Sequence, residues 1–254
     1  MLKDPRKGYV LFNTELECDS YDAKQALIAL AKAETVVVFS SFASQVMLGY
    51  ADVILPITPY TETAGSFVNM EAKWQKFNGV TRPLDDAKPA WKVIRVLANT
   101  LNVPNFEYDD IGQVRKEMVA LDNTQDLLGS MVLATENLEI TPPQIKGLMR
   151  IGVQGIYNGD SIIRRSLPLQ QTKMAQAPTL IINEKVAIQC GIDEQGHNLV
   201  RVVQADYFED FEVVISDKVA DDTVYLAVND TTSGFAGRFD PIGLDKSQIK
   251  QVRL

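Results

Sequence analysis

The chain has 254 residues, of which 46% are hydrophobic and 23% charged, and its formal net charge is −8 at pH 7. This length and apolar content are typical of a globular chain with one large or two modest domains, and they argue against disorder. The net negative charge argues against a nucleic-acid partner, because phosphate binding requires a basic face.

The sequence also argues against membrane insertion and against a cysteine-rich metal site. No apolar run approaches the ~20 residues that span a bilayer, and the N-terminus lacks the pattern of a secretion signal, so we expect a soluble, cytoplasmic chain. Cys18 and Cys190 are the only cysteines and lie far apart. We therefore expect no disulfide framework and no metal site, and the chain alone lacks the ligands of a cysteine-bound iron–sulfur cluster.

The first elements predicted along the chain are a strand and a helix. The apolar run Tyr9–Phe12 predicts a short strand before a turn. Apolar residues then recur at helical spacing, and Asp19 or Ser20 is the expected cap of that helix. The residues on the helical stripe are Ala23, Ala26, Leu27 and Leu30.

Two further strands are predicted around a short helix. The β-branched run Val36–Phe39 is typical of a buried parallel strand. Residues 46–50 suit a helix, and the apolar run Val53–Leu55, stopped by Pro56, predicts an interior strand that ends at the carboxyl edge of the sheet. Together they form a βαβ unit with a right-handed crossover. In doubly wound sheets, ligands bind at that carboxyl edge.

The clearest amphipathic helix is predicted at Ala90–Leu101, between the start signal Pro89 and the stop signal Pro104. A shorter helix follows, with Asp110 as its expected cap. We expect the apolar stripes of both helices to pack into the core. The stripe residues are Trp91, Ile94, Leu97, Ala98 and Leu101 in the first helix and Ile111, Val114, Met118 and Leu121 in the second.

The composition and periodicity predict three parts: an α/β domain at residues 1–125, an irregular connection at 126–176 and a small β domain at 177–254, for which the family resemblance described below implies a barrel-like fold. Polar breaks before residue 147 indicate the connection, which carries one candidate strand at Met131–Leu133. In the last part, residues 182–192 suit a short helix that Gly191 terminates in the left-handed conformation. Strands predicted at 199–203, 211–215 and 224–228 have the regular spacing of a small closed sheet.

Two stretches resemble known families. Residues 51–71 read Ala-Asp-Val-Ile-Leu-Pro, then Glu62, then Gly-Ser-Phe-Val-Asn-x-Glu, in the order and spacing of a signature of the molybdopterin oxidoreductase superfamily. Residues 156–172 resemble the Tyr-x-x-Asp-x-x-x-Arg-Arg-x-x-x-Leu-Gln-x-Thr segment of the G subunit family of bacterial NADH-quinone oxidoreductase, respiratory complex I. The resemblance covers most of residues 36–254, although members of this family are several times longer.

The resemblance implies a fold and a role. The expected fold is α/β: part of a parallel-sheet molybdopterin oxidoreductase-like domain, followed by a small domain like a double-psi barrel. The expected role is a non-catalytic, structural C-terminal portion of the iron–sulfur G subunit, whose iron–sulfur clusters lie in N-terminal domains that this chain lacks. The implied partners are other peripheral-arm subunits of complex I, and the implied location is the cytoplasmic side of the bacterial inner membrane.

A second hypothesis is a fragment of a true molybdopterin-dependent oxidoreductase, of the formate dehydrogenase or nitrate reductase type. The resemblance then makes Ser40, Ser41, Glu62 and Asn69 candidate contacts of the pterin cofactor. A small polar residue after a strand more commonly caps the next helix. The chain also departs from the superfamily pattern, because Glu71-Ala72-Lys73 stands where many relatives have Glu-Gly-Arg, and Lys lacks the bidentate geometry of Arg. A third hypothesis is an independent α/β binding module, but the sequence has no glycine-rich phosphate fingerprint.

The remaining candidate groups are one histidine, three carboxylates and an arginine pair. His197 is the only histidine, which argues against a histidine-based triad or zinc site, and its polar context indicates an exposed turn. Asp52, Glu62 and Glu71 form a paired-carboxylate site only if their loop folds back. Arg164 and Arg165, next to Asp160, are the most informative charges, because adjacent guanidinium groups can fork onto carboxylates. We expect their partners to be carboxylates of the same chain or of a partner surface.

Overall fold

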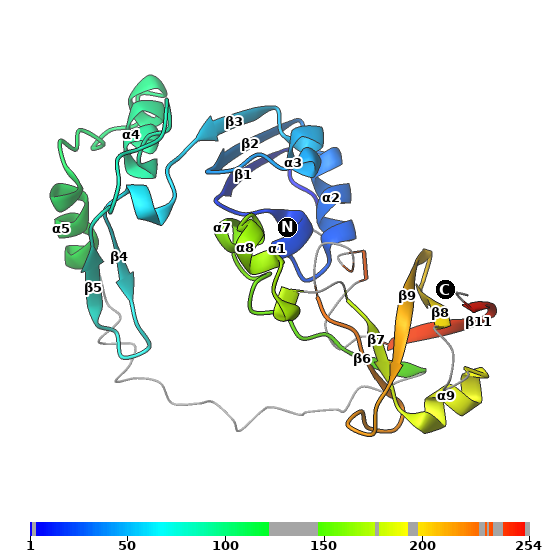
Figure 1. Ribbon diagram of the computed structural model, residues 1–254. Helices are drawn as coiled ribbons and strands as arrows, with labels where there is room; N and C mark the ends of the chain where they lie inside the picture. Colours follow the sequence, from blue (N-terminus) through cyan, green and yellow to red (C-terminus); the bar gives the residue numbers. More distant parts are fainter. Residues whose placement is uncertain are drawn as a thin grey trace, which may run out of the picture.

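The computed structural model describes residues 1, 4–121, 147–175, 178–192, 198–228, 232, 234–235 and 241–251. The strand predicted at Met131–Leu133 and the turn predicted around His197 lie outside the described residues. Figure 1 shows a small sheet near the N-terminus, an excursion of two helices and a hairpin on one side of it, and a barrel on the other.

The N-terminal sheet consists of β1 (Gly8–Phe12), β2 (Thr35–Ser40) and β3 (Val53–Pro56), in the order β1-β2-β3, with both pairs parallel. Two helices, α2 (Ala23–Ala31) and α3 (Gln45–Tyr50), connect these strands. The core between the sheet and the helices is formed by Tyr9, Ala29, Leu30, Val36, Val38 and Met47. The strand–helix–strand unit predicted at 36–55 is therefore present.

Two details of this unit differ from the prediction. The cap of α2 is Asp22, whose carboxylate accepts from the Gln25 N–H at 2.8 Å; Asp19 instead ends the short helix α1 (Leu16–Asp19). Moreover, β3 is an edge strand, paired in the described part of the chain with β2 alone, and Val53 is 44% exposed. The apolar run at 53–55 correctly predicted a strand, but it did not reveal whether another strand lies beside it.

Residues 57–121 form an excursion from the sheet. It begins with η1 (Tyr60–Glu62) and the antiparallel hairpin of β4 (Gly65–Val68) and β5 (Trp74–Phe77). The helices α4 (Ala90–Thr100) and α5 (Ile111–Leu121) follow. At Gly65, a Cβ atom would collide with the Phe77 ring, which explains why glycine occupies this position.

Both predicted helices are present, but the expected burial of their stripes is only partly correct. Asp110 caps α5, since its Oδ1 accepts from the Gln113 N–H at 3.0 Å. Trp91 is only half-buried, and Leu101 is 64% exposed. Met118 and Leu121 are exposed as well. An amphipathic pattern identifies the apolar face of a helix, but burial of that face requires an element that packs against it.

A closed barrel forms the last part of the described chain, with strand order β10-β6-β11-β8-β9-β7. Its strands are β6 (Leu148–Ile151), β7 (Leu180–Ile182), β8 (Asn198–Gln204), β9 (Tyr207–Ile215), β10 (Thr223–Tyr225) and β11 (Pro241–Gln251). Its core includes Leu180, Ile182, Val200, Val202, Val224 and Leu226, none of which is exposed. Closure removes unpaired strand edges, so the barrel is complete in itself.

The barrel helix α9 (Glu184–Cys190) ends as predicted. Gly191 follows it at φ 71°, in the left-handed conformation that a glycine terminator supplies. At its start, the Asn183 side chain accepts from the Val186 N–H at 2.8 Å. One barrel strand, β6, comes from the segment 126–176, for which we predicted an irregular connection.

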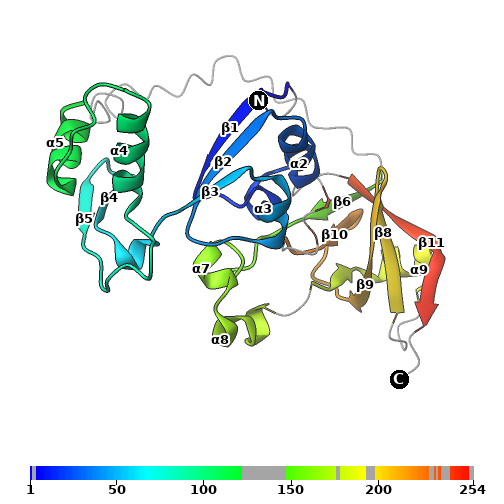
Figure 2. The same ribbon diagram turned by 90° about the horizontal axis from the view of Figure 1, so that it is seen from above.

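Between β6 and β7 lie α7 (Ser161–Arg164), α8 (Leu167–Gln170) and η3 (Lys173–Ala175). Figures 1 and 2 both show α7 and α8 beside the ends of the N-terminal strands rather than against the barrel. This segment therefore leaves the barrel domain, contacts the sheet and returns. Within the part of the chain that the structure describes, no helix is long and apolar enough to cross a membrane.

Candidate functional site

The candidate site lies at the carboxyl edge of the β1–β3 sheet. After β1, the chain turns at Asn13, which has φ 46° and donates its N–H to the Phe39 carbonyl at 2.7 Å. The turn leads directly to Glu15 and α1. After β2, Phe42 and Ser44 lead into α3, and Ser44 caps that helix by accepting from the Met47 N–H at 2.9 Å. Two strand ends therefore bring side chains to one edge, where doubly wound sheets bind ligands.

The arginine pair at the end of α7 reaches this edge. Arg164 binds Glu15 at 3.0 Å through Nη2 and Asp19 at 3.2 Å through Nη1. Arg165 places Nη2 at 2.6 Å from Glu15 Oε1, out of line for a hydrogen bond, and its guanidinium lies 4.6 Å from the centre of the Phe42 ring. One carboxylate, Glu15, is therefore shared by two guanidinium groups.

Burial makes this cluster energetically important. The side chains of Arg164 and Glu15 are 6% and 5% exposed. Burial lowers the pKa of Arg164, but Asp19, Cys18 and Glu15 outweigh this effect, so the net pKa is raised and the guanidinium remains charged. Removing one member of a buried pair leaves an uncompensated charge, which costs about 3–5 kcal/mol.

A third carboxylate, Glu17, extends the cluster toward α3. It accepts hydrogen bonds from the Ser44 hydroxyl and, at 3.5 Å, from the Tyr50 hydroxyl. Burial, the charges of Glu17 and Glu15 and the hydrogen bond to Glu17 together raise the pKa of Tyr50. The phenol therefore stays neutral over the physiological range.

A cavity of about 290 Å³ opens among these groups. Its lining residues are Glu15, Glu17, Cys18, Ser44, Val46, Arg164 and Arg165. The two arginines are already engaged by Glu15 and Asp19, so the cavity offers carboxylate oxygens more than free cations. Such a lining disfavours a phosphate-bearing ligand.

The four candidate pterin contacts lie at three places in the fold: Ser40 and Ser41 at the end of β2, Glu62 in η1, and Asn69 in the turn between β4 and β5. Ser40 is buried, and its hydroxyl binds the backbone of Phe42. It donates to the Phe42 carbonyl at 2.7 Å and accepts from the Phe42 N–H at 3.2 Å. Glu62 accepts from the Leu84 N–H at 3.0 Å. Asn69 holds the β4–β5 turn by accepting from the Lys73 N–H at 2.9 Å. Their role as pterin contacts stays a prediction.

The hydroxyl of Ser41 behaves differently. Ser41 Oγ and Thr58 Oγ1 are buried and make no hydrogen bond within the described residues. They follow β2 and β3, whose ends are paired through Ser40 and Pro56. Two unsatisfied hydroxyls at a carboxyl edge are the polar groups that a ligand or ordered water would satisfy.

Asp52, Glu62 and Glu71, which the sequence suggested as a possible paired-carboxylate site, lie on different elements. Asp52 accepts from the Val36 N–H at 2.7 Å, at the amino end of β2. Glu71 pairs with Lys73 at 2.7 Å in the hairpin turn, whereas Glu62 lies in η1. The described residues also contain no group of three or more histidine, cysteine, aspartate or glutamate side chains that could hold a metal ion.

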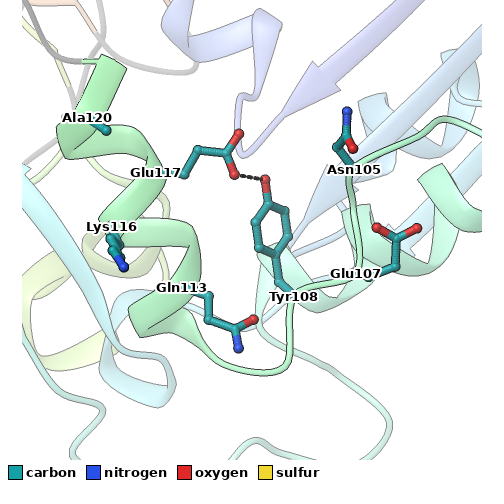
Figure 3. Close-up of a pocket in the computed structure, with 7 residues that line it drawn as sticks. All are labelled: Asn105, Glu107, Tyr108, Gln113, Lys116, Glu117 and Ala120. Carbon is teal, nitrogen blue, oxygen red and sulfur yellow. Dashed lines mark hydrogen bonds between the residues drawn. The ribbon is translucent and has the colours of Figure 1, made fainter.

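A second cavity, of about 450 Å³, lies between α5 and the loop before it. Figure 3 shows Tyr108 pointing across the cavity to Glu117 of α5. The hydrogen bond to Glu117 is the main cause of the raised pKa of Tyr108. This contact ties the loop to the helix.

The sequence indicated the importance of the arginine pair but not its main partner, Glu15. One signal was available, because Glu15, Glu17 and Asp19 directly follow the predicted strand at Tyr9–Phe12. Glu15 and Arg164 are 149 positions apart. Only the fold could show that the acidic run and the arginine pair meet.

Comparison with known proteins shows which families the chain resembles. Residues 1–100 match the family model of molybdopterin oxidoreductases. The chain is 38% identical over 157 residues to the mitochondrial NADH-ubiquinone oxidoreductase 78 kDa subunit of Candida albicans, covering 58% of this chain and 20% of that protein. With the same protein of Neurospora crassa it shares 33% identity over 101 residues, or 40% of this chain and 12% of that protein.

The other similar proteins are a formate dehydrogenase relative and a structural neighbour. A putative formate dehydrogenase of Bacillus subtilis is 40% identical over 72 residues, covering 28% of this chain and 7% of that protein. In structure, the chain resembles acetylene hydratase from Pelobacter acetylenicus with a TM-score of 0.63, over 94% of this chain and 44% of that one, at 13% identity. This likeness shows a shared fold.

The chain spans 20% of the length of the Candida albicans relative, 12% of the Neurospora crassa relative and 7% of the Bacillus subtilis relative. The family match and the similarity to the 78 kDa protein confirm the resemblance predicted from residues 51–71 and 156–172. Residues 1–100 match the molybdopterin oxidoreductase family, and over 157 residues the chain is similar to the 78 kDa subunit of NADH-ubiquinone oxidoreductase.

Proposed function

We propose that this chain is a structural, non-catalytic portion of an iron–sulfur subunit of a proton-translocating NADH:quinone oxidoreductase, corresponding to the C-terminal region of the bacterial G subunit. One observation carries the proposal. At the carboxyl edge of the sheet, where a ligand would bind, Arg164 and Arg165 are bound to Glu15 and Asp19.

The chemistry of that edge supports a structural role. A pterin cofactor of molybdenum enzymes carries phosphate, and stabilising phosphate requires free cations or free backbone N–H groups. Here the two guanidinium groups are neutralised by carboxylates, and Glu17 adds a further negative charge. The residues present therefore do not fit that cofactor, and we derive no catalytic step from it.

The rest of the proposal concerns the parent assembly. Its iron–sulfur clusters would be held by other domains, and this chain would catalyse no step of NADH oxidation by itself. Its partners would be other peripheral-arm subunits, on the cytoplasmic side of a bacterial inner membrane. Within the chain, the closed barrel would be the double-psi barrel of the superfamily, with domains at 1–125 and 177–254.

Elemental analysis of the purified parent assembly tests this function. We expect no stoichiometric molybdenum or tungsten and no pterin fluorescence after oxidation. In the same assembly, Arg164→Lys together with Arg165→Lys should reduce the assembled fraction, because lysine keeps the charge but loses the bidentate fork. Stoichiometric molybdenum or tungsten would refute the proposal, and so would normal assembly of the double variant.

A second candidate function is pterin binding in an oxidoreductase of the formate dehydrogenase type. Ser41 and Thr58 favour it, because their buried hydroxyls at the carboxyl edge make no hydrogen bond within the described residues. If a cofactor satisfies these groups, Ser41→Ala should lower the pterin content of the purified assembly. An unchanged pterin content in that variant would remove the reason for this alternative.

A further inference from the structure

The carboxylates at the carboxyl edge of the sheet are held by bonds within the N-terminal part of the chain. The Glu15 N–H donates to Asp19 Oδ2 at 2.8 Å, and the Asp19 N–H donates to the Glu15 carbonyl at 2.8 Å. These bonds fix the two residues at opposite ends of α1. Glu17 accepts from the hydroxyl of Ser44, the cap of α3. None of these bonds involves α7, so they arrange the acidic groups independently of the arginine pair.

An aromatic ring is held at the same edge. The Ser40 hydroxyl binds both backbone polar groups of Phe42, its carbonyl at 2.7 Å and its N–H at 3.2 Å. The Phe42 ring centre lies 4.6 Å from the guanidinium carbon of Arg165, which is a cation–π distance. Carboxylates beside an aromatic face are the groups that bind a planar, forked cation. The edge therefore has the parts of a guanidinium receptor.

Two guanidinium groups occupy these parts in the structure. Arg164 reaches Glu15 at 3.0 Å through Nη2 and Asp19 at 3.2 Å through Nη1, so one guanidinium plane spans two carboxylates. Arg165 Nη2 lies 2.6 Å from Glu15 Oε1, but this buried oxygen accepts no hydrogen bond from the described residues. Arg165 is also held by its own helix, since its Nη1 donates to the Ser161 carbonyl at 3.0 Å. A guanidinium without a backbone is free to align with Glu15 Oε1.

Burial and charge make the receptor dependent on its cations. The side chains of Glu15 and Arg164 are 5% and 6% exposed, and the cavity of about 290 Å³ lies beside them. The carboxylates of Glu15, Glu17 and Asp19 face only the two guanidinium groups of the arginine pair. Loss of either arginine leaves an excess of negative charge that is partly buried, and such charge is strongly unfavourable. A small cation that enters the cavity relieves this excess, whereas an anion is repelled.

We propose that the carboxyl edge of the β1–β3 sheet is a preformed guanidinium-binding site, which the arginine pair of the same chain fills. Its ligand class is an alkylguanidinium of the size of an arginine side chain, and the site takes this ligand from solution when Arg164 is truncated. The inference goes beyond the proposed function, because it assigns a binding site and a ligand chemistry to the chain by itself.

Chemical rescue tests this site. Arg164→Ala deletes the atoms that ethylguanidinium contains, so this compound replaces what the variant lacks. Thermal unfolding of the purified 254-residue variant is followed with ethylguanidinium up to ~20 mM, far below the molar concentrations at which guanidinium denatures proteins. We expect Tm to rise by roughly 3–6 °C at about ten times the dissociation constant. Ethylammonium has the same charge without the fork and should raise Tm by no more than about 1 °C.

Control variants assign the rescue to this site. The chain with both arginines should show no rise in Tm, because its site is filled. Glu15→Gln added to Arg164→Ala removes the shared carboxylate and should abolish the rescue. Arg201→Ala is the matched control, since Arg201 binds Asp210 at 2.7 Å and 3.1 Å on the barrel, with exposed fractions of 23% and 24%. Water reaches that pair more freely, so ethylguanidinium should raise the Tm of Arg201→Ala less.

Arg165→Ala provides a second test that does not depend on the folding of Arg164→Ala. Arg165 is 32% exposed, so its loss is expected to be milder, and circular dichroism verifies the fold of each variant. Ethylguanidinium should raise the Tm of Arg165→Ala as well, because Glu15 Oε1 and the Phe42 ring are then unoccupied by a cation.

Three results would overturn the inference: no rise in Tm for either arginine variant, an equal rise with ethylammonium, or a rise that persists after Glu15→Gln. An equal rescue of Arg201→Ala would also overturn it, because any carboxylate freed of its arginine would then bind the ligand. The measurement uses the chain alone and needs neither the parent assembly nor its metal content. Its failure is therefore distinguishable from failure of the proposed function.

Discussion

The barrel and the excursion at 57–121 differ in how far they bury their apolar side chains. The barrel closes on itself and buries a continuous core that includes Leu180, Val200 and Leu226. Neither described core cluster contains a residue of the excursion. Its apolar side chains, such as Met70 at 98% exposure and Leu101 at 64%, remain at the surface. One chain therefore combines a unit that buries its apolar side chains within itself and a unit that leaves many of them exposed.

The sheet lies between these extremes, because its core packs against α2 and α3 while Val10 and Val53 are exposed. The arginine pair at the end of α7 binds at its carboxyl edge. We therefore expect stability to be concentrated in the barrel and at the ion-pair cluster, and to be lower in the excursion.

The largest contrast should come from leucine truncations in the two regions. Leu180→Ala removes a fully buried side chain of β7 and should cost about 2–5 kcal/mol of unfolding free energy. Leu101→Ala, at 64% exposure, should cost within about 0.5 kcal/mol. Urea denaturation measures both. Equal losses would mean that the excursion has a core of its own.

The ion-pair cluster should rank next. Arg164→Ala leaves Glu15 buried with one fewer partner and should cost about 3 kcal/mol. Lys185→Ala is the control, because Lys185 and Asp221 pair at 2.9 Å with both side chains more than half exposed, and it should cost about 0–1 kcal/mol. If the two variants lose the same stability in denaturation, the buried cluster does not hold α7 on the sheet.

Alkaline pH should weaken the sheet unit through Tyr50. Its pKa is raised above the ordinary value of 10.0 by burial and by Glu17 and Glu15, so the folded state holds the proton more tightly than the unfolded state. The stability that this difference contributes is fully present below pH 10 and is lost as the pH rises toward the folded-state pKa. Tyr50→Phe should therefore show a shallower decline of unfolding free energy above pH 10 than the wild type. Identical slopes would contradict the burial of this phenol.

The smallest expected effects concern two left-handed positions, one in each region. Ala72 of the excursion has φ 57°, and Gly191 of the barrel has φ 71°. Ala72→Gly should stabilise by roughly 0.5–1 kcal/mol because glycine adopts this conformation without strain, whereas Gly191→Ala should destabilise by about 1 kcal/mol. Thermal unfolding measures both, and the same sign for both changes would show that backbone strain does not decide their effects.

Ala72 also explains a departure noted in the sequence. The superfamily pattern that residues 51–71 resemble has glycine at this place, and here alanine occupies a left-handed position that glycine suits.

Local patterns predicted most of the elements correctly. Gly191, Asp110 and the run Val36–Phe39 act through hydrogen bonds and periodicities that span a few residues, and each behaves as expected. The cap of α2 was misassigned because Asp19, Ser20 and Asp22 are all good caps, and packing decided among them.

The candidate site was predicted only in part. The chemistry of Arg164 and Arg165 indicated carboxylate partners, and the structure supplies Glu15 and Asp19 from the same chain. The set Ser40, Ser41, Glu62 and Asn69 was inferred from a family resemblance. In the structure, three of these residues form hydrogen bonds with local backbone groups, and their role as pterin contacts stays a prediction.

By itself, the sequence determined the strand–helix–strand unit, the two amphipathic helices, three of the barrel strands (β8, β9 and β10) and the family resemblance. These depend on spacing and side-chain type within short windows. Only the tertiary structure decided that Glu15 meets Arg164, that β6, β7 and β11 complete the barrel and that β3 pairs with β2 alone within the described residues. The physical reason is that burial and ion pairing depend on which distant segments pack together. A local pattern does not identify the segment that will pack against it.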